Sequence, residues 1–283
     1  RILNIILVVL ALLIDTNLYL YVLAIILTGL IEIIIKWLYI RKKCIYGCKP
    51  LMKYKNKEMF FSLMKFSFWA AIDSFAARYI IAINPSILGI TAGAAQISIF
   101  TLGSTIEGYV WQFAYGLDGM FIPKLSDMNT GNAKSDDYTN LMIKVGRIQL
   151  IFAGFIIVGF IALGREFIND IWKLKSSDIE ASYDLSYFVA IFLLLPCFVT
   201  FTQQIGNTTF IVKGKVKYNS ISTILTAIIT VSLSFLLTYL FPDYAAIMAA
   251  IAVCVGKAIG MIILSNIFYS KILKINSYIF FVI

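Results

Sequence analysis

Five ionisable side chains lie inside long apolar stretches of this sequence, where a charge is costly. They are Asp73, Arg78, Glu107, Asp118 and Lys257. A charged residue at the centre of a membrane-spanning helix costs roughly 2.5–3.5 kcal/mol, even on the most lenient insertion scales. The first four belong to one predicted helical hairpin and cannot all face lipid, so they must face other helices or water. We therefore expect a polar interior within a bundle of apolar helices, which is typical of transport proteins.

The predicted helix over residues 94–122 carries a stripe of polar and small residues. At 100° per residue the members of the stripe lie within about 40° of one another; they are Gln96, Gly103, Glu107, Ala114 and Asp118. A stripe with an acid at its middle suits a helix that lines a cavity. The alternative is a seam between helices, in which Glu107 is bonded to a neighbour and has no part in function. We favour the cavity.

The cation Lys257 lies mid-span, close to Gly256 and Gly260. A lysine at this depth needs an acidic partner or an aqueous cavity, and the small neighbours allow close helix packing. Glu107 is a plausible partner for Lys257 across the bundle.

Asp73 and Arg78 are five residues apart on one predicted helix. Arg78 either bends back to form an internal pair or substrate contact, or it snorkels to the nearby outer surface. For Asp73 we favour an interior position. Glu32, in an earlier span, is expected to pair with Lys36 at i, i+4.

Pro196 is expected to kink the predicted span over residues 184–212. Polar side chains follow it near the predicted cytoplasmic end, led by Gln203 and Gln204 and continued by Asn207, Thr208 and Thr209. They suit a gate or hydrogen bonds to a sugar headgroup. Polar packing between helices accounts for them equally well.

The composition is that of a polytopic α-helical membrane protein. The 283 residues are 60% hydrophobic and 14% charged, whereas a soluble domain is about half apolar and a quarter charged. The net charge of +9 comes mainly from basic segments between the spans, which favours membrane topology over nucleic-acid binding. Histidine is absent and the four cysteines are scattered, so we predict no metal site, no cofactor and no enzymatic activity.

We predict an all-α transmembrane bundle of eight spans and the beginning of a ninth, in a single domain. The spans cover residues 2–14, 18–40, 60–83, 94–122, 145–163, 184–212, 218–241 and 244–269. Residues 41–57 form a basic loop that we place in the cytoplasm, residues 84–89 a turn, residues 123–144 a polar cytoplasmic loop and residues 164–183 an outer loop. The first residue is Arg1 and the last ones are apolar, which suggests a fragment.

The motifs around the central hairpin resemble those of a known family. A basic loop precedes Phe66-Ser-Phe-Trp-Ala-Ala-Ile-Asp73, and the next span ends in Pro123-Lys-Leu-Ser126, followed by a Gly/Asp-rich loop and then by Lys144 to Arg147. This pattern resembles Wzx-type polysaccharide (O-antigen) flippases of the multidrug/oligosaccharidyl-lipid/polysaccharide exporter superfamily, over residues 1–275. The resemblance implies a two-lobed exporter of twelve to fourteen spans, with residues 1–40 ending the first lobe, 41–57 linking the lobes and 58–283 forming most of the second.

The resemblance further implies a flippase in the bacterial cytoplasmic membrane that moves polyprenyl-pyrophosphate-linked oligosaccharide outward by alternating access. Membrane lipids and glycan polymerases are the implied partners. Arg78 and Lys257 would contact the pyrophosphate, and Glu107 or Asp73 would couple transport to H⁺ or Na⁺. Two alternatives stay open: a multidrug exporter of the same superfamily, whose acids would face a cationic drug, and a membrane glycan polymerase, which we rank last.

Overall fold

The computed structural model describes residues 18–43, 56–131, 134–168 and 184–275. Within these ranges the chain is all-helical, as predicted, and contains no strand. The chain divides into two units, Arg1–Lys57 and Glu58–Ile283. In the first unit, α2 (Leu18–Lys43) covers the predicted span 18–40, and Glu32 and Lys36 form the predicted ion pair on its exposed surface. The predicted span 2–14 and most of the loop 41–57 lie outside the described residues.

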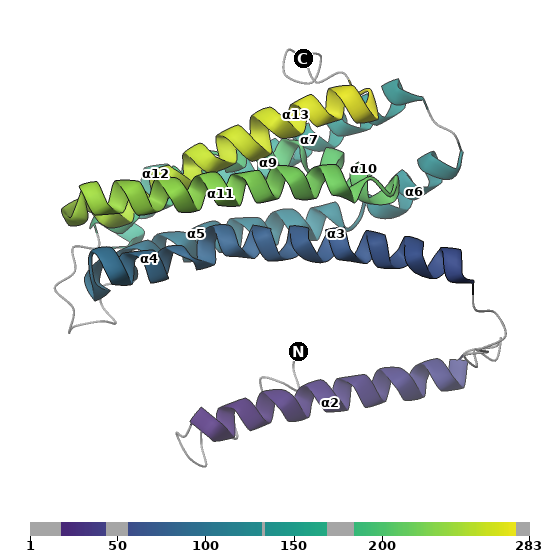
Figure 1. Cartoon of the computed structure of the whole chain (residues 1–283), viewed down its shortest axis with the longest axis horizontal. Coiled ribbons are helices and arrows are strands. Elements are labelled where there is room, and N and C mark those ends of the chain that lie inside the picture. The colour runs from purple at the N-terminus through teal and green to yellow at the C-terminus, as the bar shows by residue number, and fades with distance from the viewer. Residues whose placement is uncertain (1–17, 44–55, 132–133, 169–183, 276–283) are drawn as a thin grey trace. The chain divides into compact units, whose positions relative to one another are not determined.

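The second unit is a bundle of long and short helices (Figure 1). Its α-helices are α3 (Lys57–Ala82), α4 (Asn84–Thr91), α5 (Ala94–Asp118), α6 (Ile122–Thr130), α7 (Ser135–Glu166), α8 (Asp184–Leu194), α9 (Cys197–Thr202), α10 (Gln204–Val212), α11 (Val216–Leu240), α12 (Ala245–Lys257) and α13 (Ser265–Phe268). A short 3₁₀ turn, Pro242–Tyr244, precedes α12, and the π-helical segments Ala258–Leu264 and Tyr269–Leu273 flank α13. The last helix of the bundle thus runs continuously from α12 through α13.

Five helical segments among the described residues are long and apolar enough to cross a membrane. They are Lys57–Thr91, Ser135–Glu166, Asp184–Thr202, Val216–Leu240 and Pro242–Leu273. The chain is therefore a helical membrane protein by length and composition of its helices. The helices α2 and α5 occupy two further predicted spans but are not among these five, so the predicted number of eight spans stays a prediction.

Two segments expected to be loops are helical. The predicted turn 84–89 is the start of α4, which has Pro85 in its first turn, where a missing N–H costs nothing. The predicted loop 123–144 consists largely of α6 and the first turns of α7. Two acids, Asp136 and Asp137, favour the positive N-terminal end of α7, and Asp137 accepts a hydrogen bond from the Lys134 backbone N–H at 2.9 Å. α7 therefore begins with polar residues, several turns before its apolar part.

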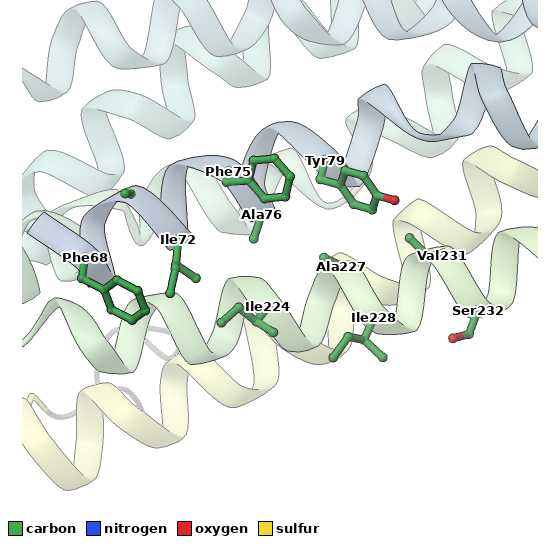
Figure 2. A pocket seen from close by; sticks show the side chains of 11 residues that line it. Phe68, Ile72, Phe75, Ala76, Tyr79, Ile224, Ala227, Ile228, Val231 and Ser232 are labelled. Atoms are coloured by element: carbon green, nitrogen blue, oxygen red, sulfur yellow. The ribbon is translucent and has the colours of Figure 1, made fainter.

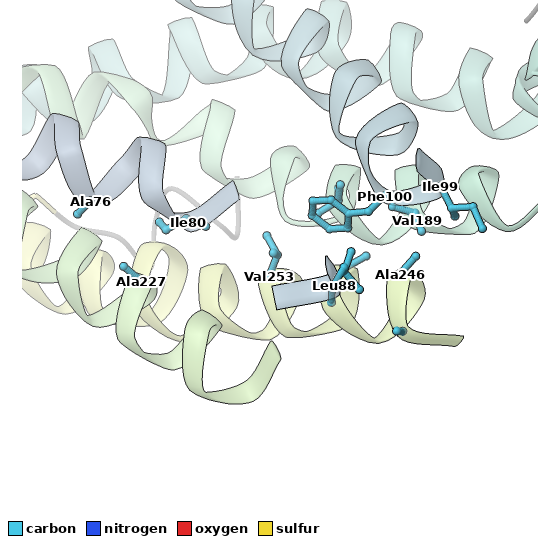
Figure 3. Packing of buried hydrophobic residues seen from close by; sticks show 13 residues of the cluster. Ala76, Ile80, Leu88, Ile99, Phe100, Val189, Ala227, Ala246 and Val253 are labelled. Atoms are coloured by element: carbon cyan, nitrogen blue, oxygen red, sulfur yellow. The ribbon is translucent and has the colours of Figure 1, made fainter. Parts of the chain in front are cut away.

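The helices α3 and α11 lie side by side, with apolar side chains on a shared outer surface (Figure 2). Behind them, α4, α5, α8 and α12 meet in a cluster of fully buried residues that includes Leu88, Phe100, Val189 and Val253 (Figure 3). Methyl-rich and aromatic side chains fill this layer, so the helices that carry the interior charges are held at fixed distances.

α11 and the last helix pack closely because glycines of the last helix lie against a row of hydroxyl side chains on α11. Along α11, hydroxyl side chains recur every four residues and are buried: Ser222, Thr226, Thr230, Ser234 and Thr238. A Cβ on Gly256 would collide with the Thr230 hydroxyl, and one on Gly260 with the Thr226 hydroxyl. This approach of α12 to α11 leaves Lys257 directed away from lipid, toward the interior of the bundle.

Candidate functional site

A polar cavity of about 210 Å³ lies inside the second unit. Side chains from α3, α5, α9, α10, α11 and the last helix line it. They are mainly amides, hydroxyls and aromatic rings, with one carboxylate: Asp73, Trp111, Tyr115, Thr200, Gln203, Gln204, Asn207, Thr208, Asn219, Ser222, Thr223, Ser265 and Tyr269. Each water takes about 30 Å³ in the liquid, so the cavity has room for several water molecules. The expected polar interior is therefore present within the described residues.

Asp73 lies on the cavity wall, partly buried, and is held by α11. One carboxylate oxygen accepts a hydrogen bond from the Asn219 amide at 3.0 Å, and the other accepts one from the Thr223 hydroxyl at 2.7 Å. Arg78 is exposed and takes part in none of the ion pairs among the described residues. The internal pair of Arg78 with Asp73 is wrong, because no ion pair joins them and Asp73 is bonded to Asn219 and Thr223 of α11 instead. The substrate contact of Arg78 stays a prediction.

The predicted kink at Pro196 is present and a second break follows it. α8 ends before Pro196, α9 spans only Cys197–Thr202, and α10 begins again after Gln203. A helix interrupted twice in one membrane crossing directs side chains and freed backbone groups toward the interior. Gln203 and Gln204, both predicted as site residues, line the cavity.

The two glutamines differ in their bonding. The Gln204 carbonyl accepts a hydrogen bond from the Asn207 amide at 3.1 Å, and the Asn207 carbonyl accepts one from the Tyr269 hydroxyl at 2.6 Å. Gln203 is 1% exposed, and neither its amide N–H₂ nor its carbonyl finds a partner among the described residues. The Ser222 hydroxyl, on the opposite wall, also has no partner there. Buried polar groups are nearly always hydrogen-bonded in folded proteins, so these two have unused binding capacity.

Glu107 and Lys257 form the ion pair that the sequence predicted, and both are buried. The side chains are 0% and 3% exposed. The same Glu107 oxygen, Oε1, accepts a hydrogen bond from the Trp111 indole N–H at 3.0 Å, while Oε2 has no partner among the described residues. Trp111 stacks on Tyr115, and both rings line the cavity. Trp111 therefore contacts both the cavity and the ion pair.

The predicted polar stripe of α5 is largely a helix seam, not a cavity wall. The Gln96 side chain donates to the Asp243 carbonyl at 2.9 Å and accepts from the Ala246 N–H at 3.0 Å, which ties α5 to the start of α12. A Cβ on Gly103 would lie 2.6 Å from Val189 Cγ1. Neither these two residues nor Glu107 lines the cavity. We favoured the cavity over the seam for this stripe, and the packing supports the seam instead.

Asp118 is the last residue of α5, and its side chain lies outside what the structure describes. Among the described residues, no group of three or more His, Cys, Asp or Glu side chains is placed to hold a metal ion.

The cavity residues that the sequence did not single out come mostly from α11 and the last helix. Asn219, Ser222 and Thr223 stand on one side of α11, and Tyr269 enters from the π-helical segment after α13. The hydroxyl row of α11 marked an interior face of that helix, but only Ser222 of this row lines the cavity, and Asn219 and Thr223 lie outside the row. Trp111 carried no such signal, since an aromatic in a span is most often packing.

Comparisons with known proteins add no relative: no family model, curated protein or solved structure matches this chain.

Proposed function

We propose that the chain is part of a flippase that moves lipid-linked oligosaccharide repeat units across the bacterial cytoplasmic membrane by alternating access. The observation that carries this proposal is the polar cavity among helices of membrane-spanning length. Unpaired polar groups in hydrocarbon are costly, so a cavity of this kind is retained where something polar must cross.

The lining of the cavity favours a neutral, hydroxyl-rich ligand. Sugar hydroxyls both donate and accept hydrogen bonds, and so do the amides of Gln203, Gln204 and Asn207. The stacked rings of Trp111 and Tyr115, with centroids 5.2 Å apart, offer a flat apolar surface to a sugar ring. A glycan can therefore exchange its hydration shell for these groups.

The two cations proposed to contact the pyrophosphate, Lys257 and Arg78, differ in their availability. The Lys257 ammonium is neutralised by Glu107 and does not line the cavity, so it meets a pyrophosphate only after that ion pair breaks. Arg78 is exposed, so it is available to a pyrophosphate without any rearrangement. For coupling to H⁺ or Na⁺, Asp73 is the better of the two candidate acids because it lines the cavity, whereas Glu107 is occupied.

The proposal is tested with the natural full-length protein in liposomes and a fluorescent polyprenyl-pyrophosphate oligosaccharide as the probe. Asn207→Ala and Gln204→Ala remove amides that line the cavity, and each should slow translocation severalfold. Thr238→Val is the matched control, because its hydroxyl bonds only within its own helix, and it should translocate normally. Wild-type protein that moves no probe, in either direction, contradicts the proposal.

The second candidate is a multidrug exporter, favoured by the presence of Asp73 in the cavity. The Asp73 carboxylate already accepts two hydrogen bonds from α11, which leaves it less free to bind a cationic drug. A deletion strain separates the two functions: loss of surface glycan with unchanged drug susceptibility supports the flippase, and the reverse pattern supports the drug exporter.

A further inference from the structure

The last helix, labelled α12 and α13 in Figure 1, changes its hydrogen-bond register directly after the ion pair. α12 ends at Lys257, and the next seven residues, Ala258–Leu264, are π-helical. We call these seven residues the π segment. A π-helical turn is closed by i→i+5 hydrogen bonds in place of i→i+4, so the segment holds about one residue more than an α-helix needs for the same turns.

This extra residue decides which side of the helix faces the interior beyond the π segment. Lys257 and Tyr269 are twelve residues apart. At 100° per residue, a continuous α-helix would place their side chains about 120° apart around the helix. When the π segment absorbs one residue, the angle falls to about 20°. The smaller angle agrees with the structure, in which Lys257 is 3% and Tyr269 1% exposed.

Polar side chains that follow the π segment bond to its carbonyl groups. The Ser265 hydroxyl donates to the Gly260 carbonyl at 3.4 Å, and the Asn266 amide donates to the Ile262 carbonyl at 2.8 Å. Side chains of this kind can supply partners to backbone groups in a membrane helix where the α-helical bonds are interrupted. Ser265 also lines the polar cavity, so the changed register and the cavity wall share a residue.

Conversion of the π segment to α-helix would change the wall of the cavity. Release of the extra residue would rotate the helix beyond the segment by about 100°. Leu264 would then take the direction that Ser265 has now, and Phe268 would take that of Tyr269. The Tyr269 hydroxyl, which donates to the Asn207 carbonyl at 2.6 Å, would leave the cavity. Two hydroxyl side chains would thus be exchanged for two apolar ones.

The surroundings confine this rotation to the part of the helix beyond the π segment. Before the segment, Lys257 is fixed by its ion pair with Glu107. Inside the segment, Gly260 lies so close to α11 that a Cβ would collide with the Thr226 hydroxyl. Beyond the segment, the ring of Tyr269 packs on a glycine of α10, Gly206, so it can turn away without displacing a side chain at that position.

We propose that the π segment is a register switch that changes the affinity of the cavity. In the π-helical state, Ser265 and Tyr269 offer hydroxyl groups to a polar solute. In the α-helical state, Leu264 and Phe268 replace them, and the weaker binding favours release. The inference rests on the transport proposed above, to which it adds a release step, but it does not depend on which polar solute is carried.

Deletion of Ile263 tests the switch by removing the extra residue. This side chain is 57% exposed, and without it the segment can be α-helical while Ser265 and Tyr269 keep their present directions. The full-length deletion variant should keep the wild-type thermal midpoint and bind the fluorescent oligosaccharide probe with unchanged affinity. It should translocate that probe at least tenfold more slowly, because the helix can no longer rotate by releasing a residue.

The matched control is deletion of Ile228, which is also 57% exposed but lies in the middle of the continuous α-helix α11. This helix has no extra residue there, so the deletion rotates one half of it by about 100° relative to the other. Thr230 moves away from Gly256, and the variant should lose its cooperative thermal transition. Equal thermal behaviour of the two deletion variants overturns the extra residue in the π segment.

Cysteine labelling tests the rotation without any transport measurement. In a cysteine-free background, Ser265→Cys should react with a small, water-soluble methanethiosulfonate whether or not Ile263 is present. Leu264→Cys should react only in the chain that keeps Ile263, because only that chain can turn residue 264 toward the cavity. Equal reaction of Leu264→Cys with and without Ile263 overturns the switch.

The switch and the flippase fail in different ways. If the wild-type protein translocates no probe, the flippase is wrong, and the labelling of Leu264→Cys still decides whether the helix rotates. If the Ile263 deletion variant translocates the probe at the wild-type rate, the flippase stands and the switch is wrong.

Discussion

At the scale of single residues, the interior contains two opposite charges that neutralise each other and one acid that is held by neutral donors. Lys257 and Glu107 form a buried ion pair, and Asp73 is bonded to an amide and a hydroxyl. A buried pair adds little net stability, but removing one partner leaves the other charge buried and alone. The stability of the bundle should therefore depend on the balance of these charges more than on either residue.

The first prediction concerns this balance. Lys257→Met leaves Glu107 unpaired and should lower the free energy of unfolding by about 3–5 kcal/mol, measured by denaturation in detergent. The double variant Lys257→Met/Glu107→Gln should recover most of the loss and keep an acceptor for Trp111. Lys36→Met, which breaks the exposed pair with Glu32, is the control and should have no measurable effect. A double variant as unstable as the single one contradicts the interpretation.

The second prediction concerns Gln203, whose amide is buried and has no partner in the part of the chain that the structure describes. Gln203→Leu removes an unsatisfied polar group and should raise stability by about 1–3 kcal/mol. The same change should lower translocation, because the lost amide is a binding group of the cavity. The thermal midpoint and the transport rate are measured on one preparation. If both quantities fall together, Gln203 has an undetected structural partner instead.

At the scale of elements, hydropathy predicted the long helices because lipid-facing residues must be apolar over a whole span. The kink at Pro196 was predictable from the missing backbone N–H. The second break at Gln203 was not, since glutamine is a good helix former. A close tertiary contact lies just beyond this break, because a Cβ on Gly206 would lie 2.7 Å from the Tyr269 ring.

Part of the candidate site was predictable because a charge in lipid is costly. Glu107 and Lys257 could be paired in advance because each requires an opposite charge in lipid. The partners of Asp73 could not be predicted, because Asn219 and Thr223 lie 146 and 150 residues further along the chain and are uncharged. The stripe on α5 was wrongly predicted to line the cavity, because polar and small residues also occur where two helices pack together.

The third prediction concerns the contact between α11 and α12. Gly260→Ala forces a methyl group against the Thr226 hydroxyl and should destabilise the bundle by about 1–3 kcal/mol. Adding Thr226→Ala should restore part of the stability by removing the hydroxyl, although the Ser222 backbone oxygen would still lie 2.9 Å from the new Cβ. Gly108→Ala is the control, because a Cβ there meets nothing within 4 Å; it should be neutral or slightly stabilising. Thermal unfolding of the four proteins decides, and equal effects at Gly108 and Gly260 refute the close contact.

At the scale of the whole molecule, the arrangement of charges predicts which ends of the helices face the cytoplasm. The turn between α10 and α11 contains Lys213 and Lys215, and Lys217 lies in the first turn of α11, whereas Asp243 lies in the turn between α11 and α12. Positive charges are retained on the cytoplasmic side. α11 should therefore run from the cytoplasm to the outside.

The fourth prediction tests this orientation by labelling single cysteines in a cysteine-free background. Asp243→Cys should react with an impermeant maleimide added to intact cells, and Lys215→Cys should react only after the membrane is opened. Lys215 is a better position for the cysteine than Lys213, because the Lys213 Nζ lies 3.8 Å from the centroid of the Tyr138 ring. A permeant maleimide should label both cysteines and serves as the control. If Lys215→Cys reacts in intact cells and Asp243→Cys reacts only after the membrane is opened, α11 runs in the opposite direction.

The ion pair also bears on how the bundle responds to the membrane potential. A single charge that crosses the bilayer exchanges about 2.3 kcal/mol per 100 mV with the field. Lys257 and Glu107 carry opposite charges joined by a hydrogen bond, so together they move through the field with almost no electrical work. While that bond lasts, this pair contributes no net charge through which a cell's voltage could drive or oppose motion of α5 and α12. Within the described lining of the cavity, Asp73 is the one carboxylate, and we expect the field to act on the proposed transport through it.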